Sequence, residues 1–145
     1  MARQRVRVTV TIDKSSINQL GVRRALYIVT DTTRLVHNRA NILTPVDTGN
    51  LRAHNSMRVF SFGTTVVGQV FNHVNYAAAV HKGQPPRIIR PKPGRGPNAA
   101  LRFKGAGGQY IYRRKVNWPG TRPRPWLLRS LIEVAPGKGF RIVTT

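Results

Sequence analysis

The stretch INQLGVRRALYIVTDTTRLVHNRANIL, residues 17–43, decides the fold. Its apolar side chains recur close to the spacing of one helix face, at Leu20, Ala25, Ile28, Leu35, Val36, Ala40 and Leu43. Pro45 follows, and the residue before a proline is biased out of the helical region, so the helix should end near Thr44. We therefore predict one long amphipathic helix, whose apolar face requires a second layer.

The flanking sequence supplies that second layer. Residues 6–12 alternate between apolar and polar side chains, which predicts a half-buried strand. Two β-rich runs, 56–62 and 64–72, are separated by Gly63 and predict a hairpin. The expected fold class is α+β, with the long amphipathic helix packed on a small, mostly antiparallel sheet. We expect a single domain over 1–145, whose compact core comprises about 4–83 and 117–145.

The remaining segment, about 84–116, has a different composition. Five prolines lie between Pro85 and Pro97, which predicts an extended, basic arm that offers few side chains to a core. Runs 99–104 and 109–116 flank the glycine-rich turn 105–108 and predict a second hairpin. A C-terminal helix should then start with Pro125 in its first position.

The charge of the chain is its most unusual property. Twenty-five Lys and Arg stand against four carboxylates, giving a formal net charge of +21. Such an excess repels itself and favours a polyanion or an acidic protein surface as partner. The absence of cysteine excludes disulfides and thiolate metal sites. No apolar run approaches the roughly twenty residues of a membrane span, and the N-terminus does not resemble a signal peptide, so we expect assembly in a cytoplasm and no membrane partner.

The sequence does not predict an enzyme. His37, His54, His73 and His81 fall on unrelated predicted elements, although His73 and His81 could approach each other across a short helix at 76–82. No HExxH or HxxxH spacing occurs, and no cluster of carboxylates could hold a hard cation. We therefore expect no catalytic residues, no metal and no cofactor.

The basic side chains are concentrated after residue 80, where no carboxylate occurs before Glu133. This set comprises Lys82, Arg87, Arg90, Lys92, Arg95, Arg102, Lys104, Arg113, Arg114, Lys115, Arg122 and Arg124. Phe103, Tyr110, Tyr112 and Trp118 are interleaved with it. Two interpretations stay open: cations and aromatics together track a nucleic acid, or the aromatics pack the hairpin onto the core while the charges meet an acidic protein.

Four segments in order carry a resemblance. They are TPVDTGNLR (44–52), YAAAVHKG (76–83), IIRPK (88–92) with ALRF (100–103), and PGTRPRPWL (119–127). Together they resemble the tail-completion or neck family of long-tailed bacteriophages, over about residues 44–131. Trp126 stands where that family usually has Phe, a conservative departure for an apolar anchor.

The resemblance implies a structural virion protein at the head–tail junction, assembled in the host cytoplasm. It implies a homo-oligomeric ring, six- or twelve-fold, between a portal-side connector or head-closure protein and a tail terminator or tail tube protein, with genomic DNA passing through. A non-enzymatic nucleic-acid-binding basic protein is the alternative. Asp47 or Thr48 should cap a short helix. The residues implicated in structure or subunit contacts are Pro45, Asp47, Thr48, Gly49, Leu51, Arg52, Tyr76, His81, Gly83, Pro123, Pro125 and Trp126.

Overall fold

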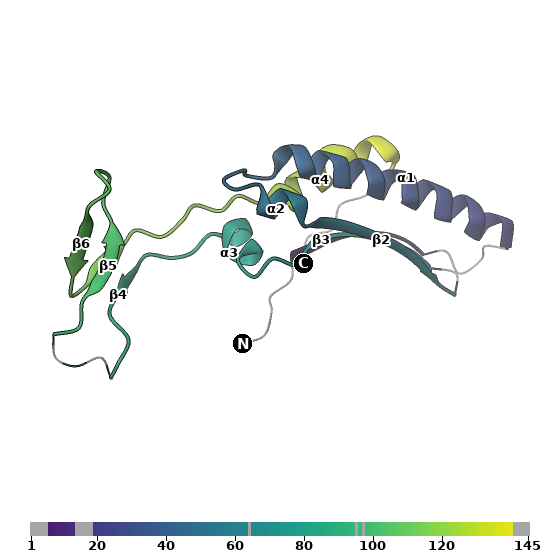
Figure 1. Ribbon diagram of the computed structural model, residues 1–145. Coiled ribbons are helices and arrows are strands. Elements are labelled where there is room, and N and C mark those ends of the chain that lie inside the picture. The colour runs from purple at the N-terminus through teal and green to yellow at the C-terminus, as the bar shows by residue number, and fades with distance from the viewer. Residues whose placement is uncertain (1–5, 14–18, 64, 95, 97, 141–145) are drawn as a thin grey trace. The chain divides into compact units, whose positions relative to one another are not determined.

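A computed structural model describes residues 6–13, 19–63, 65–94, 96 and 98–140, with side chains described for all of these except residues 12, 13, 19 and 20. The chain divides into two compact units (Figure 1). We call Met1–Lys82 with Pro123–Thr145 the core unit and Gly83–Arg122 the arm unit. The described elements are β1 (Val6–Asp13), α1 (Gln19–Leu43), α2 (Asn50–Ala53), β2 (Asn55–Phe62), β3 (Thr65–Asn72), α3 (Ala77–Lys82), β4 (Arg87–Ile89), β5 (Leu101–Lys104), β6 (Tyr110–Arg113), β7 (Val116–Trp118), α4 (Trp126–Val134) and the 3₁₀ turn η1 (Pro136–Lys138).

The core unit is a helix layer on an antiparallel sheet, which confirms the expected α+β class. The strand order is β1-β3-β2, so the predicted hairpin β2–β3 contributes the centre of the sheet and the N-terminal strand completes it. The helices α1 and α4 contact each other and lie on one face of the sheet (Figure 1). Val8 of β1 and Met57 of β2 both pair with Val70, whose side chain is buried beneath α1.

The buried face of α1 contains Ala25, Val36 and Ala40 as predicted, but it differs from the prediction at residue 28. Ile28 is 36% exposed, whereas Val29 is fully buried against the sheet, so the assignment of Ile28 to the core is wrong. This face passes through Thr32 and Thr33, which are also fully buried. Each threonine hydroxyl donates to the carbonyl four residues earlier, at 2.8 and 2.6 Å. Because these bonds satisfy the hydroxyls, threonine is accepted in a face that hydrophobic periodicity alone does not assign to it.

A glycine in β3 sets how closely α1 approaches the sheet. A Cβ built on Gly68 would lie 1.9 Å from Oγ1 of Thr33 and 3.0 Å from Cγ1 of Val29. No side chain fits in that space, so the helix rests directly on the strand backbone.

The short helices depart from the predicted caps. The residue preceding α2 is Gly49, with φ 80°, and no side-chain cap bond is made there. Neither Asp47 nor Thr48 therefore caps α2, because the left-handed glycine occupies the capping position itself. Pro125 likewise precedes α4 instead of starting it, so this helix begins one residue later than predicted. Gly83 has φ 73° after α3, as expected of a glycine that ends a helix.

A buried amide network joins four elements of the core unit. Asn72 donates to the carbonyl of Leu51 at 2.7 Å and to Oδ1 of Asn55 at 2.9 Å. The amide of Asn55 donates to Thr44 at 2.8 Å, and its Oδ1 also lies 3.4 Å from the indole nitrogen of Trp126. The network fixes the 44–52 segment and α4 to the end of the hairpin. Hydrophobic periodicity does not predict this network, and its signal in the sequence is an asparagine at the outer end of each β-rich run, Asn55 before 56–62 and Asn72 at the end of 64–72.

The arm unit consists of two small antiparallel sheets. The second hairpin is present as β5–β6, with Phe103 opposite Ile111. The predicted single strand 109–116 is wrong, because β6 ends at Arg113 and the chain then forms β7, which pairs with β4. The ends of the arm unit meet, since Gln84 and Thr121 exchange two backbone hydrogen bonds of 3.1 and 3.0 Å.

Candidate functional site

The arm unit has no interior of its own. None of its described residues is buried, whereas the core unit contains two clusters of buried side chains. Two-stranded sheets are marginally stable in water without a further layer. The arm unit therefore lacks a second layer of its own among the described residues.

The arm unit is also uniformly cationic. Its sequence contains ten basic residues and no carboxylate: Arg87, Arg90, Lys92, Arg95, Arg102, Lys104, Arg113, Arg114, Lys115 and Arg122. Arg95 lies outside the described residues. Every other member is exposed, as are the remaining predicted contact cations Lys82 and Arg124 of the core unit, and none of these described side chains forms an ion pair.

Two of the three core-unit carboxylates whose side chains are described, Asp31 and Glu133, form ion pairs. Lys138 lies 3.0 Å and Arg34 3.1 Å from Asp31, and their hydrogen bonds lower the pKa of this carboxyl below its ordinary value. Glu133 on α4 pairs with Arg39 on α1. These pairs are exposed and contribute little stability. All three pairs join residues of the core unit, and none of the described cations of the arm unit pairs with a carboxylate.

The hairpin β5–β6 has two chemically different faces. The register places Leu101, Phe103 and Ile111 on one face together with Arg113, so that a small, partly exposed apolar surface lies beside one cation. Tyr110 and Tyr112 occupy the other face and are 51% and 59% exposed. The two rings are therefore not buried within the arm unit itself.

Guanidinium groups lie against aromatic rings in both arm sheets. The Cζ atom of Arg102 is 4.4 Å from the ring centroid of Tyr110, and that of Arg87 is 5.1 Å from the ring centroid of Trp118. Such cation–π contacts hold long side chains in place at modest energy. Two of the arm cations, Arg87 and Arg102, are therefore held against the strands of their own sheets.

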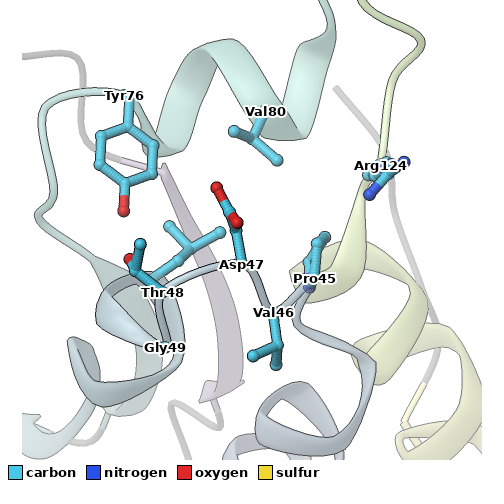
Figure 2. A pocket seen from close by; sticks show the side chains of 9 residues that line it. Pro45, Val46, Asp47, Thr48, Gly49, Tyr76, Val80 and Arg124 are labelled. Atoms are coloured by element: carbon cyan, nitrogen blue, oxygen red, sulfur yellow. The ribbon is translucent and has the colours of Figure 1, made fainter. Parts of the chain in front are cut away.

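The 44–52 segment borders an open pocket in the core unit (Figure 2). The pocket has a volume of about 310 Å³ and is lined by residues 45–49 and by Leu51, Tyr76, Val80 and Arg124. Figure 2 shows the carboxylate of Asp47 extending towards the side of the pocket formed by Tyr76 and Val80. Asp47 has no hydrogen-bond or ion-pair partner among the described residues. Asp47 and Arg124 are the charged residues of this lining, and they do not form an ion pair with each other.

The histidines are not brought together as a catalytic or metal-binding set. His73 lies 5.2 Å from His54 and His81 lies 5.1 Å from Trp126, measured between ring centroids, so each of the two histidines contacts a different aromatic ring. Burial lowers the pKa of His81 below its ordinary value, and the adjacent charge of Lys82 lowers it further. Nε2 of His81 is buried without a hydrogen-bond partner. The neutral ring thus serves as packing for Trp126.

The other residues implicated by the resemblance separate into two groups. Leu51 and Trp126 are buried in the main core cluster. Exposed or partly exposed are Pro45, Thr48, Gly49, Arg52, Tyr76, Gly83, Pro123 and Pro125. The hydroxyl of Tyr76 accepts a hydrogen bond of 3.1 Å from Asn50. The first group maintains the fold, and the second group is available for contacts.

The sheet of the core unit presents a second surface that no motif or charge cluster of the sequence predicts. On the face opposite α1, Arg58 lies 5.6 Å from the ring centroids of both Phe60 and Phe71, and it donates two hydrogen bonds to Gln69. Phe62 at the end of β2 is 82% exposed. No described helix covers this face, so Phe60 and Phe62 leave apolar surface exposed on the core unit.

Within the described part of the chain, no group of histidines and carboxylates could hold a metal ion, and no helix has the length and apolarity needed to cross a membrane. Comparison of the chain with protein-family models, with curated proteins and with solved structures found no match.

Proposed function

We propose that this chain is a non-catalytic structural subunit of a tailed-bacteriophage virion. In this proposal it forms a homo-oligomeric ring at the head–tail junction, between a portal-side connector or head-closure protein and a tail terminator or tail tube protein. The four-segment resemblance motivates the assignment, and the observation that carries it furthest is the arm unit, whose described residues include no buried side chain.

The physical argument concerns where the arm unit finds a second layer. The arm unit has too little apolar surface to be stable by itself. Its small apolar surface, formed by Leu101, Phe103 and Ile111, becomes buried when it lies on another subunit. The uncovered sheet face around Phe60 and Phe62 offers apolar surface on the core unit. A subunit that carries both an unsupported arm and an uncovered face is suited to repeated contacts with copies of itself and with other virion proteins.

The first test compares the full chain with a variant lacking most of the arm unit. Because Gln84 and Thr121 form a doubly hydrogen-bonded pair, residues 85–120 can be replaced by the two-residue turn Asn-Gly. Both proteins are treated with nuclease and analysed at high salt by size-exclusion chromatography with light scattering and by electron microscopy. We expect rings from the full chain and a folded monomer, verified by a cooperative melt, from the shortened one. A full chain that becomes monomeric when nucleic acid is removed would support the alternative of a free nucleic-acid-binding protein.

The second test asks what the charges of the arm unit meet. We propose that most of them face acidic surfaces of neighbouring proteins and that a minority line the DNA passage. Charge reversal to Glu is made one position at a time at Arg90, Lys92, Arg95, Arg113 and Arg114, and assembly is examined in virions. Most reversals should prevent joining and yield separate filled heads and free tails. Normal joining with altered DNA retention or ejection would contradict this assignment, because the charges would then face the channel.

A further inference from the structure

A hollow in the arm unit is lined by three cations that come from two separate segments of the chain. It has a volume of about 420 Å³, and its lining consists of Arg90, Pro91, Lys92, Ala100, Leu101 and Arg102. Arg90 and Lys92 follow β4, whereas Arg102 lies on β5. The chain reverses between these segments, where Gly94 has φ 90°. The fold thus gathers three positive charges around one opening, which we call the cationic hollow.

The cations of the hollow are supported by their surroundings. Arg90 and Lys92 each precede a proline, and a residue before proline is held in an extended conformation. Arg102 is held by an aromatic ring, since its Cζ atom lies 4.4 Å from the ring centroid of Tyr110. Tyr110 therefore acts as a support for Arg102. A ligand of the hollow accordingly costs less conformational freedom than a ligand of three cations on a flexible loop.

The charges of the hollow are not neutralised by the chain itself. All three side chains are exposed, and none of them pairs with a carboxylate among the described residues. Like charges that share one opening repel each other, and an anion bound between them relieves this repulsion. The hollow is therefore suited to an anionic ligand.

The rest of the lining indicates which anion fits. The side chains of Pro91, Ala100 and Leu101 offer neither a stacking plane nor a hydrogen-bonding group, so the hollow has no means of reading bases. A DNA duplex keeps its bases stacked inside and presents about one negative charge per 1.7 Å of helix axis on its outside. Neighbouring phosphates can thus meet three cations in one small opening. An acidic protein would have to bring several mutually repelling carboxylates to the same place, which makes it the weaker partner.

We propose that Arg90, Lys92 and Arg102 form a site for backbone phosphates of duplex DNA. This inference rests on the proposed function for the source of its ligand, since the DNA that passes through a head–tail junction is the duplex viral genome. It identifies a minority of the arm cations as the ones that face the DNA. Of the five positions chosen for charge reversal, Arg90 and Lys92 are therefore the two at which head–tail joining should remain normal.

The test compares two triple variants of the full chain that remove equal charge from the arm unit. The hollow variant carries Arg90→Ala, Lys92→Ala and Arg102→Ala. The matched control carries Arg113→Ala, Arg114→Ala and Lys115→Ala, which lie outside the lining of the hollow. Fluorescence anisotropy of a labelled mixed-sequence duplex measures binding to nuclease-treated protein over a range of salt concentrations. Because all six side chains are exposed, both variants should melt at the parent temperature.

The salt dependence gives the expected signature. Each phosphate contact contributes about 0.9 to the slope of log K against log salt, so the loss of three contacts should reduce the slope by about 2.7 for each subunit that contacts the duplex. The control should reduce it by no more than about 0.9, the equivalent of one contact. Two duplexes of unrelated sequence should bind the parent equally, because phosphate contacts carry no sequence information.

Three results would overturn the proposal. Equal reductions in the two variants would show that duplex binding follows the net charge of the arm unit instead of the hollow. An unchanged slope in the hollow variant would show that its three cations do not contact phosphates. Polyglutamate that competes as well as unlabelled duplex at equal charge concentration, and does so through the hollow, would assign the hollow to an acidic protein.

The ring and the phosphate site fail independently. Light scattering of the same nuclease-treated samples reports the oligomeric state without reference to DNA. A ring whose duplex affinity is the same in the parent and the hollow variant refutes the phosphate site alone. A monomer whose duplex binding depends on the hollow refutes the ring alone.

Discussion

Replacing Gly68 by alanine tests whether the helix layer rests directly on the backbone of β3. The new Cβ would lie 1.9 Å from Oγ1 of Thr33, where carbon contacts are ordinarily about 3.5–4.0 Å. The hydroxyl cannot swing away without breaking its 2.6 Å bond to the carbonyl of Val29. Overpacking of this kind lowers the free energy of unfolding by about 1–3 kcal/mol, and loss of the hydrogen bond lowers it by about 1 kcal/mol. Replacing a glycine within a strand raises it by about 0.5–1 kcal/mol.

The net expectation for Gly68→Ala is a loss of about 2 kcal/mol, which lowers the melting temperature by roughly 8 °C. Thermal unfolding followed by circular dichroism measures it, with Gly137→Ala as a control because an added Cβ there meets nothing within 4 Å. In the double variant with Thr33→Ala the closest remaining contacts are 3.0 and 3.1 Å, so the two losses should be clearly less than additive. A Gly68→Ala protein that melts at the parent temperature, or strictly additive losses, would refute the close approach.

Three further predictions concern the core unit. Asn72→Ala should destabilise the core unit by about 2–4 kcal/mol, because the buried carbonyl of Leu51 loses its amide donor and the rest of the network is broken. Urea denaturation measures this loss. A loss below about 0.5 kcal/mol would show that the network is not needed for stability. Leu127→Ala should cost about 2–5 kcal/mol and Ile28→Ala much less, since the first side chain is fully buried and the second is at the surface; equal melting temperatures would contradict this difference. The pKa of His81 is lowered in the folded state, so the unfolded state binds more protons and the free energy of unfolding should decrease as the pH falls below about 6.5. Denaturant titrations across that pH range should show a shallower decrease for His81→Asn. If the free energy of unfolding of this variant falls with pH as steeply as that of the parent, the lowered pKa of the partly buried ring is contradicted.

The local pattern of the sequence determined most of the secondary structure. Alternation in residues 6–12, the glycine between two β-rich runs and the helical spacing of residues 17–43 correctly predicted β1, the β2–β3 hairpin and α1. Composition also determined the charge, because ten basic residues and no carboxylate in the arm unit do not depend on how it folds. These features depend on residues that are close together in the chain, so they can be predicted from the sequence without a structure.

The tertiary structure decided what depends on residues far apart in the sequence. Apolar side chains stand at both 28 and 29, and only the closeness of α1 to Gly68 selects Val29 for the core. Asp47 is a residue type that often caps helices, but the left-handed Gly49 occupies the position before α2. The carboxylate of Asp47 therefore lies at the edge of a pocket instead. The two faces of the β5–β6 hairpin likewise follow from a pairing register that no local pattern fixes. Packing and register are decided by the best simultaneous fit of distant segments, and a single stretch of sequence does not contain that information.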